Sequence, residues 1–185
     1  GQGRGDRPHG GGEVHPDTPA WTWSEEQGVG CIRRRQAHEA LIHRLDAELT
    51  SGDRTPMDAG LCTDGVDEVL HIMYGGTQPW GRFTPDPTQT VAVHTTDTNR
   101  FWLVTLGQFT GTDAVGTSHD EPDLAVVASD DGALDTGEPA AATVSGAAPD
   151  LDCWLWHRPP LGEVQRSGDP LVLERLDHTI AEGIT

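Results

Sequence analysis

The sequence predicts an α+β fold, in which helices near both ends of the chain flank a block of strands. Apolar residues recur at helical spacing between residues 24 and 74, and again between residues 149 and 184. Between residues 90 and 148 they alternate or run continuously, as they do in strands. Because the strands are grouped and do not alternate with helices, the pattern does not favour a regular βαβ array.

Residues 1–20 are predicted to form a flexible tail. They are rich in glycine and proline and contain few apolar side chains. Burial therefore cannot offset the conformational entropy that ordering would cost. Trp21 and Trp23, in the string "WTW", are the first residues expected to dock onto a core.

Residues 24–52 form the clearest predicted helix. Ser24 and Gln27 have the spacing of a capping box, and Gly52 suits the C-terminal cap. Apolar residues spaced by about 3.6 positions give the helix one packing stripe. The members of that stripe are Ile32, Leu41, Leu45 and Leu49.

A second helix is predicted over residues 64–74. Thr63 or Asp64 would cap its start, and the pair Gly75 and Gly76 would end it. Its buried face would consist of four apolar side chains, Val66, Val69, Leu70 and Met73.

Strands are predicted from residue 90 onward. Residues 90–98 and 101–107 would form a hairpin around the turn "TNR", and residues 123–129 and 141–148 would add two strands. The acidic run at 116–123 is interpreted as a hydrated loop, with cation binding as the alternative.

Two helices are expected at the C-terminal end, over residues 149–158 and 169–184. Each begins with a proline next to an aspartate, a combination typical of a helix start. The apolar face of the last helix would be Leu171, Leu173, Leu176, Ile180 and Ile184. The six tryptophans are assigned to the core or to a junction between domains.

Composition argues against two classes of partner. The formal net charge is −18, so the surface repels phosphate backbones and nucleic acid is not an expected partner. No apolar run approaches the roughly 20 residues that span a bilayer, and no signal peptide is visible. Three scattered cysteines without a CxxC pair favour reduced thiols in a cytoplasmic protein.

Glu39 and His43 form the candidate metal site. Residues four apart share one face of a helix, and a carboxylate with an imidazole suits zinc or another divalent ion. The string "HEALIH" is not an HExxH motif, because Ile42 occupies the position of the second histidine. The alternative is a surface ion pair of Glu39 with His43 or Arg35. If the two residues bind a metal, a third ligand must come from elsewhere in the protein.

Long strings of this sequence resemble one enzyme family. They include "RRRQAHEALIHRLDAELTSGDRTPMDAGLCTDGVDEVLHIMYGG", "WLVTLGQFTGTD", "DEPDLAV" and "VSGAAPDLDCWLWHRPP". From about Pro19 to the end, the chain is similar to the mycothiol-dependent maleylpyruvate isomerase family of actinobacteria, which belongs to the DinB/YfiT-like metalloenzyme superfamily. The resemblance implies part of a metal-binding helical bundle followed by a sterol-carrier-like α+β domain. We therefore expect a tail at 1–20, a bundle remnant at 21–55 and a C-terminal domain at 56–185.

The resemblance also implies a site and a chemistry. Glu39 and His43 match metal ligands of the family, zinc is the expected metal, and mycothiol is the thiol cosubstrate. Arg158, in "LWHRPP", matches an arginine that holds carboxylates of a small-molecule substrate. The residue before it is His157, where the family has glycine. Interaction with a helix C-terminus is the alternative role for Arg158.

The family's third ligand lies on an earlier helix, and no helical pattern precedes Ser24. We therefore expect either a fragment of an enzyme, which adds thiol for cis–trans isomerisation or thiol transfer, or a chain made inactive by a shortened bundle. A non-catalytic module that binds a small ligand or a partner is the alternative from another class. A third hypothesis is that an exposed bundle helix drives formation of a homo-oligomer.

Overall fold

The computed structural model describes residues 14–22, 28–129 and 139–183. The chain divides into two compact units, residues 1–40 and residues 41–185. The predicted capping box at Ser24 and Gln27 lies outside the described residues. The predicted α+β class is confirmed, because a mixed sheet is combined with helices that precede and follow it.

The first helix, α1, spans Val29–Ser51. It ends as predicted at Gly52, whose φ of 82° lies in the left-handed region that glycine adopts without steric cost. The predicted stripe is confirmed for Leu41 and Leu45, which are both buried. It is wrong for Ile32, which is 40% exposed.

The second helix, α2, spans Ala59–Glu68 and begins earlier than the sequence indicates. Asp58 is its N-cap, and a carboxylate oxygen of Asp58 accepts a hydrogen bond from the backbone N–H of Leu61 at 2.8 Å. Thr63 and Asp64 therefore lie inside the helix and do not cap it. The predicted start missed this first turn, although Leu61 and the fully buried Cys62 belong to it.

The helical path continues as a π-helix, η1, over Val69–Tyr74. Gly75 ends it, and the N–H of Gly75 donates to the carbonyl of Leu70, five residues earlier. The predicted end is therefore confirmed. The predicted apolar face is confirmed as well, with Val66, Val69 and Leu70 fully buried and Met73 packed at the margin of the core.

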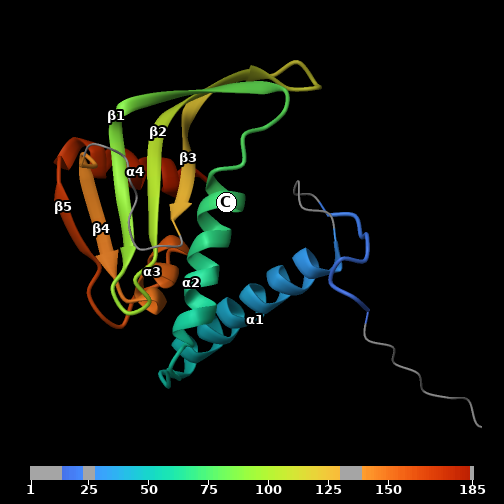
Figure 1. The fold of residues 1–185 in the computed structure, drawn as a ribbon, viewed down its shortest axis with the longest axis vertical. Coiled ribbons are helices and arrows are strands. Elements are labelled where there is room, and N and C mark those ends of the chain that lie inside the picture. Colours follow the sequence, from blue (N-terminus) through green and yellow to red (C-terminus); the bar gives the residue numbers. More distant parts are fainter. Residues whose placement is uncertain (1–13, 23–27, 130–138, 184–185) are drawn as a thin grey trace, which may run out of the picture. The chain divides into compact units, whose positions relative to one another are not determined.

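Within the described residues, the sheet has five strands in the order β3-β2-β1-β4-β5 (Figure 1). Only β1 and β4 are parallel, and the other neighbouring pairs are antiparallel. The strands are β1 (Gly81–Thr95), β2 (Phe101–Thr112), β3 (Ser118–Ser129), β4 (Ala142–Gly146) and β5 (Gln165–Gly168).

The hairpin between β1 and β2 confirms the predicted turn. His94 is paired with Phe101, their rings stack at 3.9 Å between centroids, and Asn99 in the turn has a φ of 54°. The left-handed region is one that asparagine tolerates better than most residues. Both strands extend well beyond the predicted ranges toward the end of the sheet far from this turn.

Two parts of the sheet were not predicted correctly. The expected hydrated loop at 116–123 is wrong, since β3 begins at Ser118 and residues up to Asp123 pair in register with β2. Strand β5 was not predicted at all, and each of its four residues is exposed. Both segments are edge strands held by backbone pairing, so their side chains carry no apolar alternation for a sequence pattern to detect.

Two further helices, α3 (Ala148–Leu155) and α4 (Pro170–Gly183), confirm the predicted C-terminal helices. One apolar core joins the sheet to α2, η1, α3 and α4. Its fully or nearly fully buried members include Val91, Val93, Trp102, Val104, Leu106, Leu124, Val144, Leu151, Leu155 and Leu176. In the last helix, Leu171 was assigned to the core incorrectly because it is 72% exposed, and Ile184 lies outside the described residues.

The tryptophans divide between core and surface. Trp102 is fully buried, and its indole N–H donates to the carboxylate of Asp67 on α2 at 2.8 Å. Trp156 is also buried, which confirms its assignment to the core. Trp21 is 83% exposed and so does not belong to the core, while Trp23 lies outside the described residues.

Helix α4 offers a paired test of the core. Leu176 is 1% exposed and Leu171 is 72% exposed, so replacing each with alanine compares the buried face of α4 with its exposed face. We expect Leu176→Ala to lower the free energy of unfolding by about 2–5 kcal/mol, because it leaves a cavity. Leu171→Ala should change it by less than about 0.5 kcal/mol. Urea denaturation measures both, and equal losses would contradict the placement of α4.

Candidate functional site

Arg158 and Asp46 form a two-point ion pair within residues 41–185. The Nε of Arg158 donates to Asp46 Oδ1 at 2.9 Å, and Nη2 donates to Oδ2 at 2.8 Å. The Nη1 atom donates to the carbonyl of Trp156 at 2.6 Å. This parallel arrangement is the one by which a guanidinium recognises a carboxylate. Arg158 therefore binds a carboxylate in the structure, and that carboxylate belongs to the protein.

The turn after α3 positions Arg158. His157 has a φ of 58°, and the N–H of Arg158 donates to the carbonyl of Cys153 at 2.8 Å. A left-handed residue without glycine costs roughly 1–2 kcal/mol. The His157 ring compensates through a contact of Nε2 with the carbonyl of Ile180 at 3.2 Å. The turn is thus formed by a histidine in a conformation that favours glycine.

The pair is half-buried, and each partner shifts the other's titration. The side chain of Arg158 is 29% exposed and that of Asp46 is 37% exposed. The hydrogen bond from Arg158 lowers the pKa of Asp46, and the same bond raises the pKa of Arg158. Both groups are therefore held in their charged forms at neutral pH.

His43 lies beside this pair on α1. Its Nδ1 is 3.7 Å from Asp46 Oδ2, and its side chain is 71% exposed. Asp46 therefore contacts two of the residues predicted for the site, although Asp46 itself was not predicted from the sequence. The sequence spacing could have pointed to Asp46, because it lies three residues after His43 and residues three apart share a helix face.

Glu39 lies on α1 one turn before His43, as predicted from the sequence. Its carboxylate forms an ion pair with Arg35, one of the partners expected under the surface alternative. Among the residues that the structure describes, no three histidine, cysteine or acidic side chains form a group that could hold a metal ion. Glu39 and His43 alone do not complete a metal site, because a divalent ion needs at least three protein donors in such centres.

A second polar cluster lies between α2 and α3 and is fully buried. Burial raises the pKa of the Cys62 thiol far above its usual range, and the negative charge of Asp152 raises it further. Burial also raises the pKa of Cys153. Gly65 allows this approach, since a Cβ there would lie 2.9 Å from Asp152 Oδ1. Neither thiol is activated as a nucleophile, because the thiolate is the reactive form.

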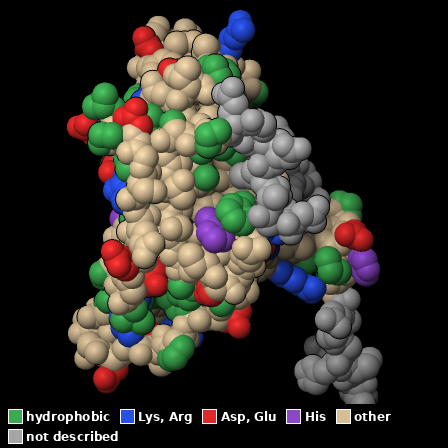
Figure 2. Space-filling view, turned by 60° about the vertical axis from the view of Figure 1, so that its left-hand side comes forward, with side chains coloured by type: hydrophobic (Ala, Val, Ile, Leu, Met, Phe, Trp, Pro, Cys, Tyr) green, Lys and Arg blue, Asp and Glu red, His purple; other side chains and the backbone are tan. Residues whose placement is uncertain are grey.

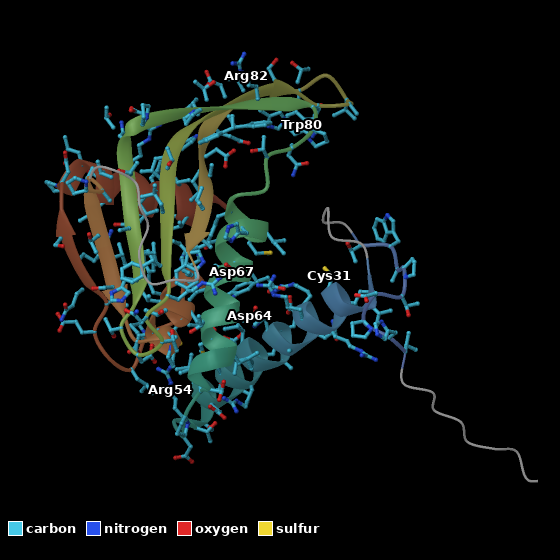
Figure 3. The ribbon with its side chains drawn as sticks, viewed as in Figure 1. Cys31, Arg54, Asp64, Asp67, Trp80 and Arg82 are labelled. Atoms are coloured by element: carbon cyan, nitrogen blue, oxygen red, sulfur yellow. The ribbon has the colours of Figure 1, made fainter. Side chains whose placement is uncertain are left out.

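Arg54 connects the segment before α2 to the end of α3, and Figure 3 labels it at that place. Its Nη1 donates to the carbonyl of Pro159 at 2.8 Å, and its Nη2 contacts Cys153 Sγ at 3.5 Å. Cys153 in turn contacts the sulfur of Met57 at 3.8 Å. These bonds hold the turn that carries Arg158, so Arg54 has a structural role.

A pocket of about 260 Å³ lies where η1, β2, β3 and α4 meet. Two carboxylates, Glu121 and Asp123, line it together with the apolar side chains of Met73 and Phe109. Asp123 is half-buried, and burial raises its pKa, with a smaller contribution from the charge of Glu121. An acidic pocket repels carboxylates, so this pocket does not fit the carboxylate-bearing substrate that the family resemblance implies.

The surface agrees with the acidic composition. Figure 2 shows acidic side chains at separate points of the visible face, with apolar side chains between them. None of the described helices is long and apolar enough to cross a membrane.

Asp123 provides a test of the pocket's electrostatics. Its pKa is raised in the folded state, so the charged form opposes folding above the pKa of the unfolded chain, which is about 3.9. We expect Asp123→Asn to raise the melting temperature at pH 7. The gain should shrink as pH falls through the raised pKa of folded Asp123 toward about 4, and it should be absent well below that, where aspartate is protonated in both states.

The matched control is Asp120→Asn, on the exposed side of the same strand. It should produce no such pH-dependent gain. Thermal unfolding followed by circular dichroism at several pH values measures both variants. A lower melting temperature for Asp123→Asn at pH 7 would show that the carboxylate is stabilised where it lies.

Comparison with known proteins identifies the domain that contains Arg158. A search of curated proteins and a search of solved structures each gave no match. The family model described as the MDMPI C-terminal domain matches residues 61–175, which is more than half of the chain. That range includes α3, the sheet and Arg158. The chain belongs to the mycothiol-dependent maleylpyruvate isomerase family, whose C-terminal domain it contains.

Proposed function

We propose that the chain takes part in mycothiol-dependent chemistry on a small carboxylate substrate, either cis–trans isomerisation by thiol addition or thiol transfer. Membership of the family supports the reaction class. The observation that carries the proposal is the two-point grip of Arg158 on a carboxylate, because the same geometry would hold a carboxylate of the substrate. The protein would act in the cytoplasm, and nucleic acid and membranes are not its partners.

In isomerisation, the thiolate of mycothiol would add to one carbon of a cis double bond that is conjugated to a carbonyl group. The electron pair of that double bond moves to the carbonyl oxygen, which leaves a single bond free to rotate. Return of the electron pair expels the thiolate and forms the trans product. Arg158 would fix one carboxylate end of the substrate while the other end rotates.

A divalent metal, with zinc as the expected ion, would hold the thiol as thiolate in this family. Glu39 and His43 would supply two of its ligands, and the remaining donor would come from another subunit or from residues that the structure does not describe. Two ligands alone hold a metal weakly, so the chain without that donor would be inactive. A homo-oligomer is one way to supply the donor.

Metal binding tests this proposal. We expect about one zinc per chain in the assembled protein, and loss of most of it in Glu39→Ala and in His43→Ala. Matched controls are Glu48→Ala on the same helix and His94→Ala on β1, which should retain the metal. Elemental analysis after gel filtration measures the stoichiometry, and the size of the eluting species shows whether a homo-oligomer carries the metal.

A metal-free protein with a normal melting temperature would contradict the metal proposal. It would favour the alternative, a non-catalytic module that binds a small ligand or a partner. The pocket lined by Glu121 and Asp123 is the observation in favour of that alternative. Its volume and carboxylates suit a small polar or cationic ligand better than an apolar one.

A further inference from the structure

Asp46 occupies the part of Arg158 that a ligand carboxylate would use. A guanidinium has five N–H donors. Asp46 takes the edge formed by Nε and Nη2, and the carbonyl of Trp156 accepts from Nη1. A second carboxylate on the same edge would need the same two donors. It would also place two negative charges next to one positive charge, which is unfavourable at this separation.

We propose that Asp46 is an internal competitor for carboxylate ligands at Arg158 and thereby sets which ligands bind. The inference rests on the proposed role of Arg158 as a carboxylate-binding residue. In the ligand-free chain Asp46 holds the guanidinium. A ligand binds when its carboxylate replaces that of Asp46.

The exposure of the pair makes this exchange physically accessible. The side chain of Asp46 is 37% exposed, so after exchange its carboxylate can turn into water without becoming a buried, unpaired charge. His43 lies 3.7 Å from Asp46 and is itself 71% exposed, so it does not enclose the carboxylate. A fully buried pair would resist the same exchange much more strongly.

Competition of this kind selects for ligands with a second anchoring group. Asp46 is attached to the same chain as Arg158, so its effective concentration at the guanidinium is far above that of a free ligand. A ligand with a single carboxylate only replaces the carboxylate of Asp46 at Arg158 and gains no additional contact with the protein. A dicarboxylate, or a carboxylate with another group that the protein binds, gains energy that the exchange alone does not provide.

The test is a maleate titration of the metal-free chain of residues 1–185 without mycothiol. We expect Asp46→Asn to bind maleate about tenfold more tightly than the original chain, because one charge-assisted competitor has been removed. Arg158→Gln, alone or combined with Asp46→Asn, should abolish binding. Calorimetry gives the affinities, and the Arg158 Nε–H resonance in NMR spectra reports the exchange directly.

The matched control is Asp177→Asn. Asp177 accepts a 2.8 Å bond from Arg166 in another exposed ion pair of the same unit, and removing it should leave maleate affinity unchanged. If Asp46 served only to position Arg158, replacing Asp46 would lower the affinity for maleate, because Arg158 would lose the contact that holds it in place. Equal or weaker binding by a folded Asp46→Asn would therefore overturn the proposal.

If Asp46→Asn fails to fold, the original chain decides the question. A maleate-dependent movement of the Arg158 Nε–H resonance, with release of Asp46, supports exchange, and an unchanged resonance at saturating maleate overturns it. Because neither metal nor thiol is present, this result is separate from the reaction. A chain that exchanges carboxylates but binds no zinc would contradict the metal proposal and leave the competition intact.

Discussion

One face of the sheet packs against α2, η1, α3 and α4, and this apolar layer holds residues 41–185 together. Alternate residues of β1 and β2 point into it, which places Val91, Val93, Trp102 and Val104 in the core. Because the period of a strand is two residues, a shift of one position would turn this whole set away from the helices. The register of the sheet is therefore fixed by the same burial that holds α2, α3 and α4 in place.

The core layer explains which elements could be predicted from the sequence. Helices α2 and α4 and the β1–β2 hairpin carry apolar residues at regular spacing, and each was predicted, although α2 and β1 begin earlier than expected. Strand β5 and the first half of β3 carry polar or charged side chains and are held by backbone pairing with neighbours. Such pairing depends on residues far away in the chain, so local periodicity could not reveal it.

The candidate site shows the same division between local and distant information. The helical position of Glu39 and His43 was predictable, because both depend only on the local period of α1. The partner of Arg158 was not predictable, since Asp46 lies 112 positions earlier in the sequence. The acidic pocket around Asp123 was missed for a related reason. It is assembled from four elements, and the sequence presents its carboxylates as an ordinary polar run.

The parallel pairing of β1 with β4 has a consequence for how this protein folds. The meander of β1, β2 and β3 closes through short connections, whereas β4 must reach the far side of β1 after both other strands have been laid down. Helix α3 follows β4 almost immediately, and Arg158 follows α3. Contacts between distant segments form slowly because chain closure costs entropy before it gains energy. The contact of Arg158 with Asp46 joins residues 112 positions apart, so it is one of the contacts whose formation carries a large cost in chain entropy.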